Sequence, residues 1–164
     1  PFGGGNQTGG AAPVGKLGLR FDRNEYETNG RLKITEIITL SPAAVAGGVK
    51  VGDYLLTVDG ARINAQTNLD ELLQHKTNRR VALTISSSAD GSSPREVAIR
   101  PVTTGAEKAL LYRQWVEDCR AYVAKVSNGR LGYVHMPDMS AQSLAQLYTD
   151  LDDDNHAREG VVVD

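Results

Sequence analysis

The sequence predicts an α+β protein in which a small, partly open β-barrel with two helices precedes a long helix and a partial parallel β-α-β unit. Two observations lead to this prediction. From Lys16 to Val102, apolar and polar residues alternate with a period of two, as in half-buried strands. After Thr104 the apolar residues recur at helical spacing, and two short apolar runs then flank one further helical segment.

The first half of the expected barrel follows from turn and cap signals. A strand at 17–21 is followed by a tight-turn signal at Asn29-Gly30 and by a second strand from Leu32 to about Ile38. Ser41-Pro42 supplies a cap and a first-turn proline for a short alanine-rich helix, which we expect Gly47-Gly48 to end.

The second half of the barrel contains three more strands and one helix. Asn68 is the expected cap of a helix from Leu69 to about His75. The strands are expected at 54–58, around 81–85 and around 97–99, with an exposed hairpin tip at 89–94.

The period then changes, and the pattern favours a second architecture. Asn128-Gly129 should end the long helix, whose apolar stripe comprises Leu111, Trp115, Cys119, Tyr122, Val123 and Val126. A strand at 131–136, a helix from about Ser140 and a strand at 161–163 follow. A connection of this length between strands indicates a parallel pair with a right-handed crossover, and one such unit buries only half a core.

Composition is that of a globular protein and excludes several classes of function. The 164 residues are 40% hydrophobic and 23% charged, with a formal net charge of −2. Such a charge gives no field that favours nucleic acid or an anionic membrane. No apolar run approaches the roughly 20 residues that span a bilayer. One cysteine excludes an internal disulfide framework and leaves the compartment open.

The two ends of the chain suggest an excerpt from a longer protein. Residues 1–15 are rich in glycine and are expected to form a flexible linker. The chain starts at Pro1 and stops after an apolar strand at Asp164, which favours a segment of a larger protein over a trimmed small one.

Two segments of the barrel region resemble a PDZ domain of the kind attached to bacterial and archaeal proteases. They are KLGLRF at 16–21 and SPAAVAGGVKVGDYLLTVDG at 41–60. The first is similar to the loop that receives the C-terminal carboxylate of a peptide. The resemblance implies a PDZ domain at 16–103 and a peptide or protein C-terminus as its partner.

Three further segments resemble the region that follows the PDZ domain in tricorn-type serine proteases, of the C-terminal-processing peptidase group. They are YRQWV at 112–116, NGRLGYVHMPDM at 128–139 and GVVVD at 160–164. The resemblance implies that residues 104–164 are the truncated start of an α/β catalytic domain. The family's nucleophile, catalytic histidine and oxyanion turn match no position here, which implies no catalytic residue and no peptidase activity in this fragment.

The resemblance also implies partners and a source. One expected partner is the rest of the chain of a prokaryotic parent protease. Whether that parent forms a homo-oligomer stays open. We expect a cytoplasmic location, with the periplasm or secretion as alternatives, and no cofactor, metal, nucleic acid or membrane. A competing interpretation is a stand-alone PDZ adaptor without an enzymatic parent.

The candidate binding site is the edge of the first strand. An extended peptide can add there as a strand, with its carboxylate on backbone N–H groups and Gly18 permitting close approach. Leu17, Leu19 and Leu72 would form the pocket for the last side chain. The candidate residues are Leu17, Gly18, Leu19, Phe21, Asn68, Leu69 and Leu72. The alternative is a surface used only for internal packing.

Other polar residues have ordinary structural interpretations. Lys16 and Arg20 flank the loop and are expected to be solvated, with a carboxylate-binding role as the alternative. His75 is interpreted as a favourable cation at a helix C-terminus. His135 lies near the carboxyl end of the expected parallel strand, where α/β folds place sites, but a structural role is favoured. His156 is expected to be exposed.

No metal or nucleophile pattern is complete. Asp150, Asp152 and Asp154 match the first positions of a calcium loop, which then fails at Asn155 and Val161, so a solvated acidic turn is favoured.

Cys119, on the apolar stripe, is interpreted as a small buried hydrophobe. The serines between 86 and 93 lie on a strand end and a hairpin tip without a general base in the pattern.

Overall fold

The computed structural model describes residues 12–138, 140–153 and 157–164. Of residues 150–153 it describes the backbone alone. The chain forms two compact units, here called the barrel unit (Pro1–Leu110) and the C-terminal unit (Leu111–Asp164). The expected linker at 1–15 lies mostly outside the described residues. The expected domain boundary at 103/104 falls about two helical turns before the boundary between the two units, which follows Leu110, and it stays a prediction.

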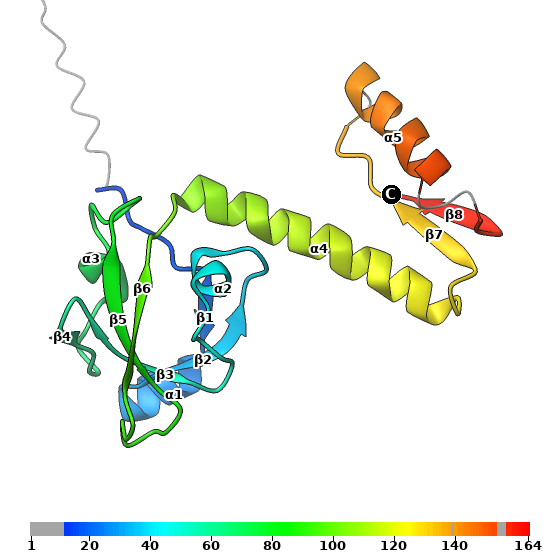
Figure 1. The fold of residues 1–164 in the computed structure, drawn as a ribbon. Helices are drawn as coiled ribbons and strands as arrows, with labels where there is room; N and C mark the ends of the chain where they lie inside the picture. The colour runs from blue at the N-terminus through cyan, green and yellow to red at the C-terminus, as the bar shows by residue number, and fades with distance from the viewer. Residues whose placement is uncertain (1–11, 139, 154–156) are drawn as a thin grey trace, which may run out of the picture. The chain divides into compact units, whose positions relative to one another are not determined.

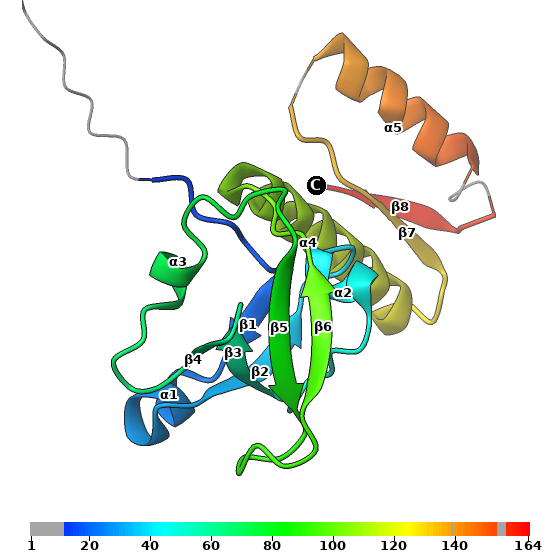
Figure 2. The ribbon, with the colours of Figure 1, turned by 60° about the vertical axis from the view of Figure 1, so that its left-hand side comes forward.

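The barrel unit is an antiparallel sheet that curls into an open barrel (Figures 1 and 2). The strand order is β1-β2-β3-β5-β6, with β4 paired to β3. An isolated bridge between Lys16 and Val102 connects the chain just before β1 to the chain just after β6. The strands are β1 Leu19–Phe21, β2 Leu32–Ile37, β3 Tyr54–Val58, β4 Ala61–Arg62, β5 Val81–Ser86 and β6 Arg95–Ile99.

A helix that the sequence analysis missed connects β1 to β2. It is α1, Arg23–Asn29, and the Asp22 side chain caps it by accepting from the Glu25 N–H at 3.0 Å. Gly30 ends it in the left-handed conformation at φ 65°. The expected tight turn at Asn29-Gly30 is therefore wrong, because the same two residue types also suit a helix C-terminus.

The other two helices of this unit follow their predicted caps. In α2, Pro42–Ala46, the Ser41 side chain accepts from the Ala44 N–H, which confirms the expected short helix. In α3, Leu69–Leu72, Asn68 caps as expected, but the helix ends three residues earlier than predicted.

The early end of α3 has a tertiary cause. The Gly15 N–H donates to the Leu73 carbonyl and the His75 N–H donates to the Pro13 carbonyl, both at 2.9 Å. These bonds hold the residues after Leu72 in a bridge with the N-terminal segment, and His75 has a left-handed φ of 56°. The interpretation of His75 as a cation ending a helix is wrong.

The core of the barrel unit follows the alternation in the sequence. Val81, Leu83 and Ile85 on β5 are fully buried at 0% exposure, and Ala82 and Thr84 between them are half-buried. The expected strands at 54–58, 81–85 and 97–99 are confirmed. The buried cluster comprises Leu17, Leu19, Leu32, Ile34, Ala43, Leu55, Val58, Leu73, Val81, Leu83, Ile85, Val97 and Ile99.

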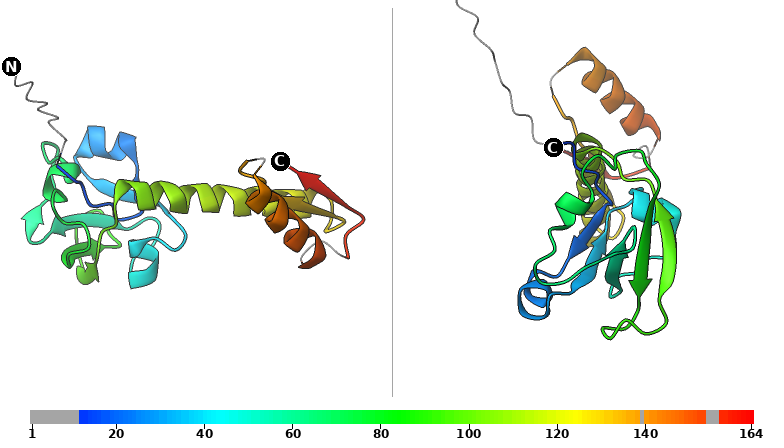
Figure 3. Two further views of the ribbon diagram at one scale, coloured as in Figure 1. Left: turned by 90° about the horizontal axis from the view of Figure 1, so that it is seen from above. Right: turned by 90° about the vertical axis from the view of Figure 1, so that its left-hand side faces the viewer.

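The C-terminal unit contains the expected β-α-β arrangement. Its elements are most of α4 (Thr104–Val126), β7 (Leu131–Val134), α5 (Ala141–Asp153) and β8 (Gly160–Val163). The strands β7 and β8 pair in parallel, from Leu131 opposite Gly160 to Val134 opposite Val163, and α5 runs alongside the pair (Figure 3).

Three expectations for this unit need correction. The strand β7 ends two residues earlier than predicted, although the Met136 N–H still donates to the Asp164 carbonyl at 2.7 Å. Cys119 is partly exposed and not buried as expected, and none of the described residues of α4 is buried. The helix α5 continues through Asp153, so the first part of the expected acidic turn is helical; residues 154–156, including His156, lie outside the described residues. Among the described helices none is long and apolar enough to cross a membrane.

Candidate functional site

The loop before β1 is held by the segment around α2. The Gly18 carbonyl accepts from the Ile38 N–H at 2.9 Å, and the Leu17 carbonyl accepts from the Ala43 N–H at 3.1 Å. Gly18 has a left-handed φ of 75°, and a Cβ on it would lie 2.0 Å from the Cβ of Ser41. The position therefore requires glycine because of Ser41, and the close approach of a ligand to Gly18 stays a prediction.

The strand β1 presents one unpaired edge. Among the described residues it pairs only with β2, where Leu19 lies opposite Ile37 and Arg20 opposite Glu36. The Gly18 carbonyl accepts from the N–H of Ile38, the residue after β2. In an antiparallel pair, successive residues point their N–H and C=O groups to opposite edges. The backbone groups of Leu19 therefore face away from β2, where an added strand could bind them.

A cleft of about 450 Å³ lies between β1 and the region of α3. Phe21, Tyr26 and Leu32 line one side, and residues 66–70 line the other. The structure thus brings together three of the predicted site residues, Phe21, Asn68 and Leu69. The Tyr26 hydroxyl donates to the Thr67 carbonyl at 2.6 Å and ties the two sides together.

The other predicted site residues belong to the hydrophobic core or the loop. Leu17 and Leu19 are 4% and 8% exposed and lie in the buried cluster, with Leu72 packed against it. None of the three lines the cleft. Their expected role as the pocket for a peptide's last side chain stays a prediction.

Charges surround the loop in an arrangement that the sequence did not reveal. The Lys16 Nζ lies 3.0 Å from Asp70 Oδ1 on α3, so the expectation of a solvated Lys16 is wrong, whereas Arg20 is exposed as expected. The Gly18 N–H donates to the Glu107 Oε1 at 3.1 Å. Sequence reasoning missed Glu107, whose only signal was an acidic side chain in the first turns of the long helix.

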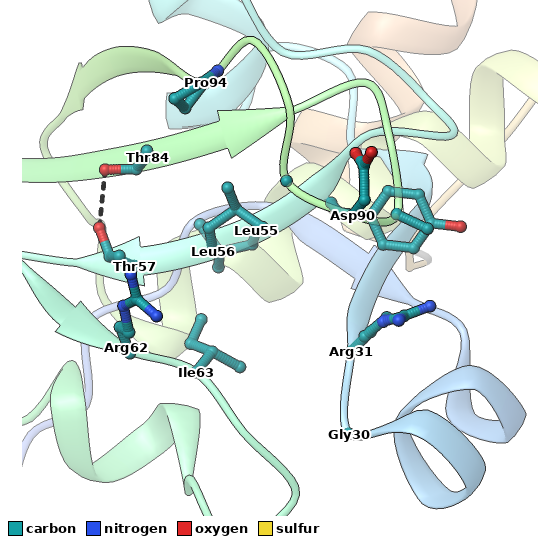
Figure 4. Close-up of a pocket in the computed structure, with 13 residues that line it drawn as sticks. Gly30, Arg31, Leu55, Leu56, Thr57, Arg62, Ile63, Thr84, Asp90 and Pro94 are labelled. Carbon is teal, nitrogen blue, oxygen red and sulfur yellow. Dashed lines mark hydrogen bonds between the residues drawn. The ribbon is translucent and has the colours of Figure 1, made fainter.

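A second cleft, of about 340 Å³, opens over β3 and the tip of the β5–β6 hairpin (Figure 4). Its charged lining residues are Arg31, Arg62 and Asp90. Thr57 and Thr84 also line it, and the Thr57 hydroxyl donates to the Thr84 hydroxyl at 2.7 Å. Hydrogen bonds from the Ser92 N–H and nearby serine hydroxyls lower the pKa of Asp90 to about 2. No residue that the sequence analysis singled out as a site lines this cleft.

His135 is enclosed in the C-terminal unit by aromatic and acidic neighbours. Its Nε2 contacts the Tyr112 hydroxyl, and its ring meets Trp115 edge to face with centroids 5.2 Å apart. Its Nδ1 is buried without a hydrogen-bond partner in the described part of the chain, and Asp164 Oδ2 lies 3.6 Å away. Both ring nitrogens are thus covered by side chains, which favours the structural role over catalysis.

The same aspartate also binds a tyrosine. The Tyr133 hydroxyl donates to Asp164 Oδ2 at 2.8 Å. Burial raises the pKa of the Tyr133 phenol well above its usual range, and the bond to Asp164 raises it further. Among the described residues no three His, Cys, Asp or Glu side chains converge as a metal site would require. The aspartates of the incomplete calcium loop have side chains outside the described set.

The class of protein follows from the strand order, from the loop before β1 and from the cleft beside it: the chain contains a PDZ domain. Residues 15–92 match the PDZ domain family. Tricorn protease homolog 1 of Streptomyces coelicolor is 37% identical over 165 residues, covering 95% of this chain and 15% of its own length. The tricorn protease homolog of Saccharolobus solfataricus is 36% identical, covering 92% of this chain and 14% of its own length.

The solved tricorn protease has the same fold over this region. Its TM-score is 0.73 at 23% sequence identity, covering 92% of this chain and 15% of that structure. The chain belongs to the tricorn protease family, and it spans about 15% of the length of the curated relatives it matches. Because the matches continue through the C-terminal unit, they extend beyond the PDZ domain alone.

Proposed function

We propose that this segment is the peptide-binding module of a tricorn-like serine peptidase, and that the groove between β1 and α3 binds an extended peptide. The observation behind this proposal is the unpaired edge of β1 beside a cleft lined by Phe21, Asn68 and Leu69. A peptide added to this edge would bond the backbone of Leu19 and place alternate side chains in the cleft.

The expected affinity is modest. Burying one apolar side chain contributes on the order of 1.5–3 kcal/mol. Ordering the peptide and restricting its motion oppose this gain, so dissociation constants in the micromolar range or weaker are expected. Such affinity suits a module that guides substrate and releases it again.

Serine peptidase activity is proposed for the whole protein and not for these 164 residues. The relatives that match along the chain are named tricorn proteases, which favours an enzymatic parent over a stand-alone adaptor. Bacterial and archaeal relatives agree with the expected prokaryotic source, and the cytoplasmic location stays a prediction. Purified chain should not cleave fluorogenic peptides; turnover that a serine-directed reagent abolishes while labelling this chain would contradict the proposal.

Peptide binding can be tested with one variant inside the cleft and one outside it. Leu69→Lys places a cation among the cleft-lining residues, and its long stem can lie along the apolar surface without unfolding the domain. Leu40→Lys makes the same change at a side chain that is 52% exposed and outside the cleft.

The readout is fluorescence anisotropy with a labelled alanine-rich hexapeptide ending in valine. We expect Leu69→Lys to weaken binding at least about fivefold, since apolar contact is lost, and Leu40→Lys to leave it unchanged. Equal effects of the two variants, or peptide-induced NMR shifts that avoid residues 19–21 and 66–72, would show that the groove is not the binding site.

A further inference from the structure

One carboxylate of the chain already occupies the loop before β1. The Gly18 N–H is one of the backbone donors of the turn that we expected to bind a peptide's terminal carboxylate, and it donates to Glu107 Oε1 at 3.1 Å. Glu107 is partly covered, whereas residues 104–106 and Lys108 around it on α4 are exposed. The contact therefore distinguishes Glu107 from its neighbours on the helix.

Backbone bonds fix the position of this carboxylate. Lys16 and Val102 exchange two backbone hydrogen bonds, of 2.8 and 2.9 Å, which hold the start of α4 beside the loop. The Thr103 hydroxyl accepts from the Ala106 N–H at 3.1 Å and caps the helix. The Glu107 N–H donates to the Thr103 carbonyl at 3.0 Å, which places the side chain one turn into α4, next to Gly18.

The neighbouring charges do not make room for a second carboxylate. Of the two cations that flank the loop, Lys16 is engaged with Asp70 on α3 and Arg20 is exposed on β1. One N–H cannot serve two carboxylates at full strength, and a peptide carboxylate placed beside Glu107 would meet like charge in a partly covered site. A free C-terminus would have to displace the Glu107 side chain before it could bind Gly18.

We propose that Glu107 is an internal ligand of the loop and determines which peptides the groove accepts. While Glu107 bonds Gly18, the groove binds extended internal segments as well as free C-termini, because the chain supplies the carboxylate itself. Removal of the Glu107 charge opens the loop and creates a preference for a free C-terminus. This inference rests on the proposed peptide-binding function of the groove.

The test compares two forms of the same labelled hexapeptide, one with a free C-terminal carboxylate and one with a C-terminal amide. We expect the unaltered 164-residue chain to bind the two forms within about twofold of each other. In Glu107→Gln and Glu107→Ala the acid form should bind about tenfold more tightly than the amide, the size expected for a charged hydrogen bond. Glu96→Gln, an exposed carboxylate on β6, is the control and should behave like the unaltered chain.

Gly18 itself is not a useful site for this test, because a Cβ there would collide with Ser41. The amide resonance of Gly18 supplies a readout without peptide, since Glu107→Gln should shift it and Glu96→Gln should not. A tenfold acid preference in the unaltered chain that Glu107 variants leave unchanged would overturn this inference alone. Failure of every variant to bind either peptide would overturn the proposed function of the groove, and the inference with it.

Discussion

The barrel unit and the C-terminal unit bury their apolar residues to very different extents. The barrel unit contains the whole buried cluster, in which Ile34, Val81, Leu83 and Ile85 are all 0% exposed. In the described part of the C-terminal unit, the buried hydrophobic side chains are Tyr133 and Val134. Large apolar side chains that remain exposed in this unit are Tyr112, Trp115, Tyr122, Val126, Leu131, Leu144, Tyr148, Val162 and Val163.

The difference reflects what each architecture can cover. Five hydrogen-bonded strands in sequence, with α2 and α3, surround one interior, so alternate residues of each strand are enclosed. Parallel sheets are stable when both of their faces are covered. The C-terminal unit has one parallel pair and one crossover helix, which covers only part of the surface of that pair. We therefore expect the barrel unit to be stable by itself and the C-terminal unit to depend on further contacts.

The largest expected effect comes from separating the two units. A protein of residues 12–110 should unfold cooperatively in urea with nearly the stability of the same unit in the whole chain, because its core is internal. A peptide of residues 111–164 should show no cooperative transition by circular dichroism. A cooperative transition in that peptide would show that the exposed apolar side chains do not limit its stability.

A pair of substitutions compares an ion pair in each unit. Asp53 is 3% exposed; it pairs with Arg95 and accepts from the Lys50 N–H at 2.6 Å and from the Ser87 hydroxyl. Asp53→Ala should cost about 3 kcal/mol of unfolding free energy, because three hydrogen bonds to a buried carboxylate are lost.

The matched change in the C-terminal unit is Glu159→Ala. The pair of Glu159 with Arg130 has both side chains more than half exposed, at 61% and 68%. Such pairs contribute less than about 1 kcal/mol. Urea unfolding of both variants measures the two losses of unfolding free energy. Equal losses would mean that the burial of an ion pair does not determine its contribution to stability in the two units.

The smallest effect concerns two aspartates whose local bonds are alike. The pKa of Asp138 is lowered to about 2 by bonds from Ser140 and Ser143 at the start of α5, as that of Asp90 is lowered in the barrel unit. A carboxyl whose pKa falls on folding stabilises the folded state above its unfolded pKa of about 3.9. Its contribution should be lost as the pH falls from about 4 to about 2.

Carboxyl NMR titrations of the separated units would sharpen the comparison. In residues 12–110 the Asp90 carboxyl should still titrate near 2, because its hairpin remains folded. In residues 111–164 the Asp138 carboxyl should return toward 3.9, since α5 would have no surface to hold it. A low value that persists in the short peptide would show that the serine bonds form without tertiary support.

Several features of the fold were readable in the sequence because their causes are local. Ser41-Pro42 predicted the start of α2, and the alternation at 81–85 predicted which side chains of β5 are buried. The helix α1 was missed because none of its residues is buried, so no hydrophobic period indicated it, and its only signals were the caps Asp22 and Gly30. Of the site, Phe21, Asn68 and Leu69 were predicted and do line one cleft.

The sequence by itself determined the strands other than β4, their inward faces, two of the helix caps and the order of the two architectures, because each depends on residues close together in the chain. Only the tertiary structure decided where α3 ends, what the missing Cβ of Gly18 makes room for, and which carboxylate reaches the loop. The bond from Gly18 to Glu107 joins residues 89 positions apart. Such a contact depends on the bridge between Lys16 and Val102, and no local pattern records that the two segments meet.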